Sequence, residues 1–191
     1  MSLPNLYLDL DETLIYSVDN RYSKKDLSEF TCHIFENYTI MERPNLQKFL
    51  DWIFKNFHVS IWSAASPDYV KFIVDKVIAT HKRKPKYVLH SEFCDKSNEK
   101  YGEIKKLEML WDHYKLPGHN HSNTFLLDDL YSNVEFQPDN SLRIKKFQGD
   151  KNDKELVSIK NILETLLKIY KEKNKLDIKK AKKSKKSPLK K

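Results

Sequence analysis

Two short apolar runs in this chain of 191 residues each end in a pair of acidic residues. The first run precedes Asp9 and Asp11, and the second, residues 124–127, precedes Asp128 and Asp129. Short apolar runs of this kind are typical of buried strands, and residues i and i+2 of a strand point to the same side. The carboxyl ends of parallel strands meet at one edge, where open α/β sheets bind their ligands. The pattern therefore predicts an α/β fold with an acidic site at that edge.

Buried carboxylates need a compensating partner, because like charges raise each other's pKa and resist close approach. A carboxylate at a strand end can attack phosphorus to give an aspartyl-phosphate, while a second one protonates the leaving oxygen and later takes a proton from water. A phosphomonoester dianion is repelled by about 4 kcal/mol per pair of unit charges at about 4 Å and an effective dielectric of about 20. Cations must therefore lie close. Lys105 and Lys106 offer ammonium groups, and oxygen ligands from two strands suit Mg²⁺.

The residues around these acids resemble a known family. Residues 9–14, Asp-Leu-Asp-Glu-Thr-Leu, are similar to the first motif of the haloacid dehalogenase phosphatases, in the wording of the branch of RNA polymerase C-terminal-domain phosphatases and NLI-interacting-factor-like proteins. Further matches follow in the family's order at Arg43-Pro44, at residues 61–64, at residues 105–111, and at residues 126–129 with Asn133 and residues 137–140. The resemblance extends over about residues 5–148, which is most of the expected folded part.

This resemblance implies roles for four catalytic residues. Asp9 is implied as the nucleophile, Asp11 as the general acid and then base, and Ser63 and Lys105 as contacts of the phosphoryl oxygens. Two alternatives stay open. The Ser63 hydroxyl could instead cap the helix that follows it, and Lys106 could replace Lys105 as the phosphate contact or both could be solvated surface lysines.

The same resemblance implies Mg²⁺ as the cofactor. Its ligands would be the Asp9 carboxylate, the backbone carbonyl of Asp11 and the Asp128 carboxylate, with Asp129 reaching the ion directly or through water.

Three more residues are candidate substrate contacts beside Ser63 and Lys105, namely Thr13, Arg43 and Asn133. Thr13 alternatively bonds the backbone and shapes the turn after the first strand. Arg43 alternatively pairs with an acid in a structural role.

Hydrophobic periodicity alternates between strand and helix patterns along the chain. It predicts strands at residues 7–10, 59–62, 87–89, 124–127 and 142–145, and helices at residues 45–57, 67–79, 103–114 and 154–170. Helix 103–114 would carry Lys105, and Leu166 would belong to the apolar stripe of the last helix. We therefore expect a three-layer, Rossmann-like parallel sheet of the haloacid dehalogenase type. A small flap at residues 17–41, with a hairpin through residues 31–35, would follow the first strand, and no second apolar core large enough for a cap domain is evident.

Charge divides the chain into two parts. Residues 171–191 contain eleven lysines and two acids, a net charge of +9, whereas the whole chain carries +8. We expect residues 1–170 to form the phosphatase domain and residues 171–191 to be a disordered, lysine-rich tail. Such a run also suits nuclear import or binding to nucleic-acid phosphates. The pair His119 and His121 lies in a Pro-Gly-Asn context without matching ligands and is interpreted as polar loop.

An intracellular enzyme, cytoplasmic or nuclear, fits the other bulk properties. The first catalytic strand begins close to Met1, no apolar run approaches membrane-spanning length, and two cysteines are too few for a disulfide framework. The combined expectation is a Mg²⁺-dependent phosphatase acting on phosphoserine or phosphothreonine of a protein or peptide, such as a polymerase tail or another nuclear target. Two alternatives remain: a nucleic-acid end phosphatase that grips its polymer with the lysine tail, and a non-catalytic phosphate-binding scaffold.

Overall fold

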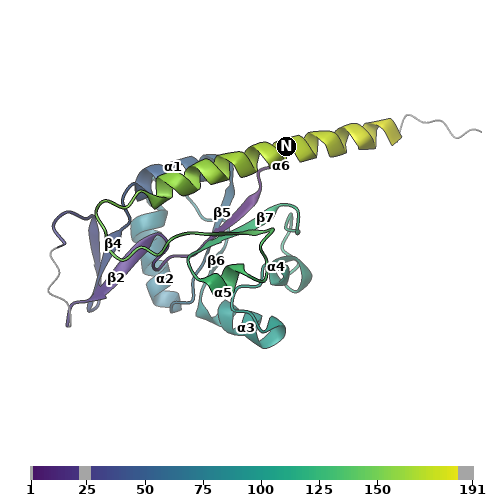
Figure 1. The fold of residues 1–191 in the computed structure, drawn as a ribbon. Helices are drawn as coiled ribbons and strands as arrows, with labels where there is room; N and C mark the ends of the chain where they lie inside the picture. The colour runs from purple at the N-terminus through teal and green to yellow at the C-terminus, as the bar shows by residue number, and fades with distance from the viewer. Residues whose placement is uncertain (1, 22–26, 185–191) are drawn as a thin grey trace, which may run out of the picture.

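A parallel sheet of five strands forms the centre of the computed structural model, which describes residues 2–21 and 27–184 (Figure 1). The strands are β1 (Asn5–Leu8), β5 (His58–Trp62), β6 (Val88–Leu89), β7 (Thr124–Asp128) and β8 (Ser141–Arg143). Their order across the sheet is β6-β5-β1-β7-β8, and every neighbouring pair is parallel. The chain builds outward from β1 to one side and then resumes on the other side with β7. The expected parallel α/β architecture is confirmed, with small shifts at the strand ends.

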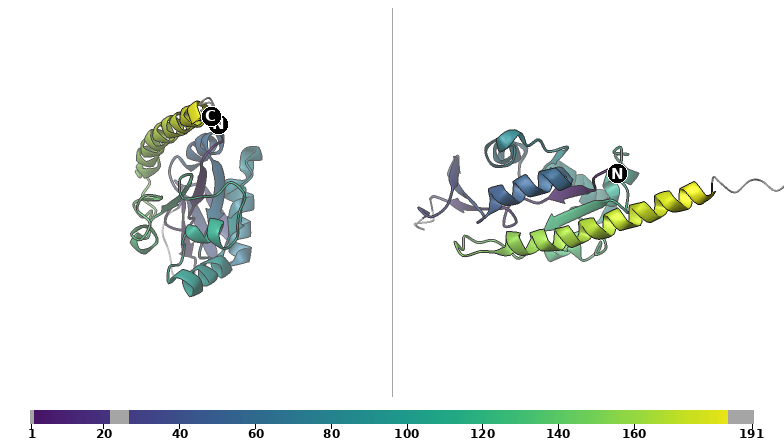
Figure 2. Two further views of the ribbon diagram at one scale, coloured as in Figure 1. Left: turned by 90° about the vertical axis from the view of Figure 1, so that its right-hand side faces the viewer. Right: turned by 90° about the horizontal axis from the view of Figure 1, so that it is seen from above.

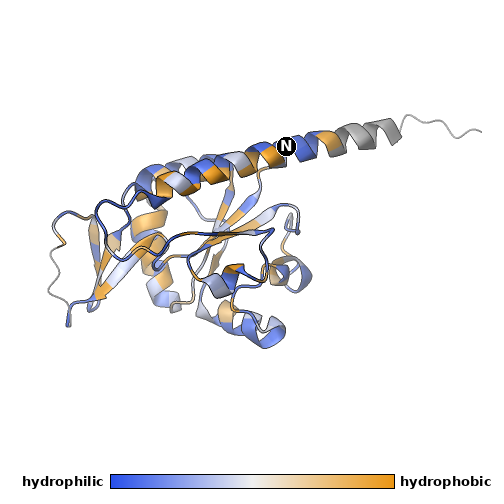
Figure 3. Ribbon diagram, in the orientation of Figure 1, coloured by the Kyte–Doolittle hydropathy of each residue, from blue (hydrophilic) through white to orange (hydrophobic). Residues whose placement is uncertain are grey.

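Alternating side chains of the strands enter two separate cores. On β1, Leu6 and Leu8 point to one face of the sheet and Tyr7 points to the other, and all three are fully buried. The helices α1 (Leu46–Asn56), α2 (Pro67–Ile73) and α6 (Glu155–Ser184) cover the first face, and the helices α3 (Ser91–Tyr101) and α4 (Glu108–Asp112) cover the second. Each fully buried aliphatic side chain contributes about 1.5–3 kcal/mol. Figure 3 shows hydrophobic colours on the central strands and hydrophilic colours on most connecting loops.

A three-stranded antiparallel flap follows β1. Its strands are β2 (Ile15–Asp19), β3 (Cys32–Phe35) and β4 (Tyr38–Glu42), in the order β2-β4-β3. The hairpin therefore joins β3 to β4, and residues 22–26 lie outside the described part of the chain. The flap is the expected small insertion, and the described residues contain no separate cap domain.

Four helical segments differ from the expectation. The helix predicted at residues 103–114 is only α4, and Lys105 lies in the turn that precedes it. Before this turn the chain forms α3, which hydrophobic periodicity did not predict because only Cys94 and Ser97 of this helix are buried. A short helix, α5 (Tyr131–Val134), also follows β7. The predicted helix 67–79 is present, but its second half is a π-helical segment, η1 (Val74–Ile78), followed by a 3₁₀ turn, η2 (Thr80–Lys82).

The last helix lies beside α1 and extends beyond the sheet (Figure 2). Its buried stripe contains Leu163, Leu167 and Tyr170, so Leu167 takes the place expected for Leu166. We expected order to end near residue 170, whereas α6 continues as a helix to Ser184; the remainder of the expected tail, residues 185–191, lies outside the described residues. Among the described helices, none has both the length and the apolar composition needed to cross a membrane.

Candidate active site

Asp9 and Asp128 lie side by side because β1 and β7 are neighbours at the point where the sheet order reverses. Leu8 is in register with Leu127, and the Asp9 N–H donates to the Leu127 carbonyl at 3.0 Å. The residues that follow both strands therefore emerge together at the carboxyl edge. Ligands bind at this switch point in open α/β sheets.

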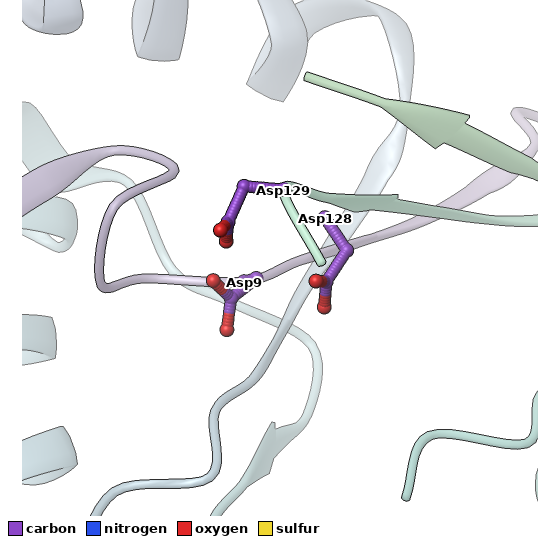
Figure 4. Close-up of side chains that lie close together, drawn as sticks. All are labelled: Asp9, Asp128 and Asp129. Atoms are coloured by element: carbon purple, nitrogen blue, oxygen red, sulfur yellow. The ribbon is translucent and has the colours of Figure 1, made fainter. Parts of the chain in front are cut away.

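Three carboxylates converge at that edge. Figure 4 shows Asp9, Asp128 and Asp129 with their side chains turned toward one another, and one oxygen of each lies within 4.8 Å of the others. All three residues are buried. Burial and the neighbouring carboxylates Asp128 and Asp129 raise the pKa of Asp9 more than Lys105 lowers it. The pKa of Asp129 is raised as well, first by burial and then by Asp128.

The donor set fits a hard divalent cation. The buried Oδ2 atom of Asp129 has no hydrogen-bond partner among the described residues, and the ammonium of Lys146 is 3.5 Å away from it. Three carboxylates with an unsaturated oxygen form the kind of oxygen-rich set that Mg²⁺ prefers. The structure thus brings together Asp9, Asp128 and Asp129, while the carboxylate of Asp11 lies outside this cluster.

A buried lysine joins two of the acids. The Lys105 Nζ atom donates to Asp9 Oδ1 at 2.5 Å and to Asp128 Oδ2 at 2.7 Å, and Lys105 is 2% exposed. Burial alone would lower the pKa of this ammonium, but Asp9 and Asp128 raise it by more, so it stays protonated. Lys106 instead pairs with Glu103 at 2.9 Å. The geometry favours Lys105 over Lys106 as the cation of the site.

Ser63 follows β5, which pairs with β1 on the side opposite β7. Its side chain is buried, and its Oγ atom accepts a hydrogen bond from the Ala65 N–H at 3.1 Å. This bond closes the turn after β5. The N-cap residue of α2 is Ser66, and no side chain makes a capping hydrogen bond to this described helix. The helix-cap alternative for Ser63 is therefore not supported.

Asp11 faces the flap and α2. Its Oδ1 atom accepts hydrogen bonds from the Tyr69 hydroxyl at 2.7 Å and from the Ser17 hydroxyl at 3.3 Å. Burial raises the pKa of Asp11, and these two hydrogen bonds and Lys105 only partly offset the increase. Asp11 is thus a partly buried carboxyl group in contact with a different wall of the site from Asp9. Sequence reasoning missed the contacts of Ser17 and Tyr69 with Asp11, because they depend on how the flap and α2 pack.

The turn between Asp11 and β2 is held by backbone and side-chain bonds. Glu12 adopts a left-handed conformation with φ 58°, and its carbonyl accepts from the Phe147 N–H at 2.7 Å. The Thr13 hydroxyl donates to Asp129 Oδ1 at 3.1 Å. Thr13 therefore links the loop after β1 to the loop after β7. This structural bond resembles the turn-shaping alternative more than a substrate contact, although its acceptor is a side chain and not the backbone.

Asn133 and Gln137 support the site from α5 and the residues after it. The Asn133 Nδ2 atom lies 3.1 Å from both carboxylate oxygens of Asp128. The Gln137 Nε2 atom donates to the Lys105 carbonyl at 2.8 Å, and Gln137 Oε1 accepts from the Leu107 N–H at 3.0 Å. These amides orient Asp128 and the turn that carries Lys105. Sequence reasoning placed Gln137 in a family motif without assigning it this function.

Arg43 is buried in a structural network. Its guanidinium donates twice to Asp153, from Nε at 2.9 Å and from Nη2 at 2.8 Å, and also to the carbonyls of Thr13 and Lys145 at 2.8 Å each. Arg43 is 1% exposed. Of the two alternatives left open for it, the geometry favours pairing with an acid.

His119 was expected to be part of a polar loop. The structure instead buries His119, and its Nε2 atom lies 2.9 Å from the Tyr7 hydroxyl.

Comparison with known proteins gives consistent matches over most of the chain. Residues 4–174 match the profile of a family described as NLI interacting factor-like phosphatase. The CTD phosphatase-like protein 355R of Invertebrate iridescent virus 6 is 39% identical over 177 residues, which cover 84% of this chain and 97% of that protein. The protein of the same description from Invertebrate iridescent virus 3 is 36% identical over 178 residues, with coverages of 84% and 95%.

Solved structures of the RNA polymerase II CTD phosphatase Fcp1 have a similar fold. One of them, from fission yeast and bound to beryllium fluoride, superposes with a TM-score of 0.54 at 17% identity and covers 87% of this chain. Another superposes with a TM-score of 0.55 at 19% identity and covers 91% of this chain. This chain spans 51% and 53% of those two chains, about half of each.

Proposed function

This chain belongs to the NLI interacting factor-like phosphatase family, and from that premise we propose that it is a Mg²⁺-dependent phosphatase that acts on phosphoserine or phosphothreonine of a protein. Membership of the family supports phosphatase activity in general. One observation supports phosphoryl transfer at this site: the Lys105 ammonium bridges Asp9 and Asp128, whose carboxylates converge at the switch point of the sheet. A buried cation beside an acid at that edge suits the transfer of a phosphoryl group.

Asp9 and Asp11 divide the chemistry between them. A carboxylate oxygen of Asp9 attacks phosphorus, so that the bond from Asp9 to phosphorus forms while the bond to the serine or threonine oxygen breaks, and Asp11 donates its proton to that oxygen. Water then attacks phosphorus, Asp11 accepts a proton from it, and the bond to Asp9 breaks to release inorganic phosphate. Burial raises the pKa of Asp11, which favours the protonated form needed for the first step.

Lys105 and Ser63 contact the phosphoryl oxygens in this proposal. Lys105 supplies a fixed positive charge, because Asp9 and Asp128 keep its ammonium in place. Ser63, on the other side of β1, supplies a hydroxyl donor. Both groups are buried before substrate arrives, so little reorganisation is needed as charge develops on phosphorus.

Asp9, the backbone carbonyl of Asp11 and Asp128 would hold the Mg²⁺, with Asp129 reaching it directly or through water. When bound, the ion neutralises charge on the carboxylates and on the phosphoryl oxygens. Asn133 and Thr13 keep Asp128 and Asp129 oriented for this task, since each hydrogen-bonds to one of these carboxylates.

Replacement of Asp9 by Asn tests the proposal. We expect turnover of p-nitrophenyl phosphate and of a phosphoserine peptide to fall roughly 10³-fold or more, because the amide is a poor nucleophile. Folding should persist, since the change removes one of several like charges. The measurement is Mg²⁺-dependent phosphate release, with thermal unfolding as the check on structure. Asp95→Asn, at an exposed position of α3, is the matched control. Wild-type rates in the Asp9→Asn variant would show that Asp9 is not the nucleophile.

Two competing functions have distinct outcomes in the same assay. A nucleic-acid end phosphatase would release phosphate from oligonucleotide ends in preference to the peptide, and deletion of residues 171–191 would weaken that activity in a salt-dependent way. A phosphate-binding scaffold would release phosphate from neither substrate with Mg²⁺ present.

A further inference from the structure

A pocket beside Asp11 lies between the flap and α2. Its volume is about 390 Å³, and Asp11 contributes to its wall. The side chains that give it chemical character are three aromatic and two acidic ones: Phe35, Tyr38, Tyr69, Glu36 and Asp68. None of these five belongs to the acidic cluster around Asp9.

The aromatic wall is fixed to the proposed general acid. The Tyr69 hydroxyl donates to Asp11 at 2.7 Å, and the Tyr69 ring stands edge-on to the ring of Phe35 with centroids 5.6 Å apart. Phe35 also packs against Phe72 of α2 at 5.0 Å. Because Asp11 protonates the leaving oxygen, the pocket lies on the side where the remainder of the substrate leaves the phosphoryl group.

Two carboxylates on this side lack a close cationic partner among the described side chains; Lys71 is paired with Asp75 instead, which raises the pKa of Lys71 together with a smaller contribution from Asp68. Glu36 and Asp68 are exposed, and neither forms a hydrogen bond or an ion pair within residues 2–21 and 27–176, the part whose side chains are described. Each would repel the dianionic phosphate of an approaching substrate. Their position is favourable only when the substrate brings a positive charge into the pocket together with its phosphate.

We propose that this pocket binds the side chain of an arginine or lysine adjacent in sequence to the phosphorylated residue. The inference rests on the phosphatase function proposed above and adds the substrate class. A cation that enters between Phe35, Tyr38 and Tyr69 meets aromatic faces, which attract it, and it ends beside Glu36 and Asp68. Arginine fits better than lysine, because its planar guanidinium stacks on aromatic rings and pairs with carboxylates through two parallel bonds.

The same charges disfavour a polyanionic substrate. In a nucleic acid, the phosphate next to the terminal one would approach the pocket and face Glu36 and Asp68 without an intervening cation. The pocket therefore argues for a basic phosphopeptide and against an oligonucleotide end as the substrate of this site.

The experiment compares two phosphoserine peptides that differ only in the residue next to the phosphoserine, arginine or glutamine, each placed before or after it in separate pairs. The readout is the ratio of kcat/KM for the two peptides on the same enzyme preparation, so changes in overall activity cancel. We expect a ratio of about tenfold in favour of arginine on at least one side. The double variant Glu36→Gln, Asp68→Asn should reduce it to about twofold or less, and the loss should be greater at low than at high salt.

The double variant Asp95→Asn, Glu99→Gln is the matched control, because both residues are exposed on α3 away from the pocket and the charge change is the same; it should keep the wild-type ratio. A wild-type ratio near one, a tenfold ratio that survives the double variant, or faster release from a phosphorylated oligonucleotide would overturn the inference. Absence of Mg²⁺-dependent release from p-nitrophenyl phosphate would instead overturn the proposed function, so the two failures are distinguishable.

Discussion

The ammonium of Lys105 ties Asp9, which follows β1, to Asp128, the last residue of β7. It donates to Asp9 and Asp128 while almost fully shielded from water. Removing one member of a buried ionic cluster leaves the others uncompensated, which costs about 3–5 kcal/mol. The same ammonium is the proposed contact of the phosphoryl oxygens, so stability and turnover depend on one residue.

Lys105→Met should therefore reduce both the stability of the fold and the turnover of substrate. We expect kcat on p-nitrophenyl phosphate to fall roughly 10²–10³-fold, since a fixed charge at the developing negative charge is lost. The free energy of unfolding should fall by about 3–5 kcal/mol in a cation-free buffer, and Mg²⁺ should restore part of it by binding the acids that have lost their ammonium partner. Urea unfolding with and without Mg²⁺ measures the second effect.

Lys106→Met is the comparison for that change. Its ammonium pairs with Glu103 near the surface, and exposed pairs contribute about 1 kcal/mol or less. Equal losses of kcat in the two variants would contradict the assignment of Lys105, and a greater loss for Lys106 would transfer the role to its neighbour.

The Tyr69 hydroxyl donates a hydrogen bond to Asp11, the proposed general acid. In Tyr69→Phe the ring and its contact with Phe35 remain, but Asp11 loses its shortest side-chain hydrogen bond. We expect kcat on a phosphoserine peptide to fall about tenfold, a part of the roughly 10²–10⁴-fold that proton transfer contributes. The loss on p-nitrophenyl phosphate should be smaller, because its leaving oxygen needs no proton. Equal losses on the two substrates would assign Tyr69 to a structural role.

Elements far apart in the chain meet at Arg43, which follows β4. Its guanidinium joins the loop after β1, through the Thr13 carbonyl, to the start of α6, through Asp153. Asp153 also accepts from the Glu155 N–H at 3.0 Å, at the first turn of α6. The pair of Arg43 and Asp153 thus anchors the last helix to the loop after β1, which begins at Asp9, the proposed nucleophile.

Asp153→Asn should make stability less dependent on pH in acid. Partial burial raises the pKa of Asp153, but hydrogen bonds from Arg43 and from the Glu155 N–H outweigh it, so the pKa is lowered on folding. A carboxyl of this kind stabilises the fold fully above its unfolded pKa of about 3.9, and the contribution is lost as pH falls through the lower folded value. At pH 7 we expect a loss of about 2–3 kcal/mol from removal of the charged bonds.

Urea unfolding of both proteins at pH 7 and at several values below pH 4 measures this dependence. The difference between wild type and variant should narrow as the pH decreases. Asp150→Asn is the control, since Asp150 is exposed in the same loop and its carboxylate accepts a hydrogen bond from the nearby Asn152 N–H. A difference that stays constant into acid would show that the pair contributes little through charge.

Sequence patterns predicted strands better than helices. Each buried strand is a short apolar run in the sequence, and this local pattern indicates a strand whatever packs against it. The polar helix α3 has too few buried residues to produce a stripe, and the apolar residues Leu107 and Leu110 suggested a longer helix around Lys105 than forms. The Ser97 hydroxyl, which donates to the Glu103 carbonyl and accepts from the Lys106 N–H, holds that segment as a turn. Such a contact becomes visible only in three dimensions.

At the scale of the whole molecule, the sequence indicated which strand ends would meet but not the surroundings of the acids. Asp9 and Asp128 could be placed together, since parallel strands share one edge. The contacts of Asp11 with Tyr69 and Ser17, and the pocket between the flap and α2, arise from packing between elements that no local pattern relates. The family resemblance supplied roles for residues, whereas the structure supplied their partners.

The buried residues of α6 indicate how much of this helix the domain needs for its stability. Leu163 and Leu167 pack onto the core with α1. Tyr170 is also buried, whereas Leu176 is 57% exposed. We therefore expect a chain ending at residue 176 to unfold within about 2 °C of the full-length protein and to hydrolyse p-nitrophenyl phosphate at the same rate. The deleted segment lies beyond residues 4–174, which match the family.

A chain ending at residue 162 should behave differently. It loses three buried side chains, and removing a single buried leucine side chain already costs about 2–5 kcal/mol, so this truncation should consume most of the stability of a domain whose total is about 5–15 kcal/mol. Thermal unfolding of both truncations, with turnover as the second readout, tests the boundary. If the chain ending at residue 176 lost its stability as well, the basic end of α6 would have to be counted as part of the folded domain, because its loss would then act on the core and not only on partners bound through charge.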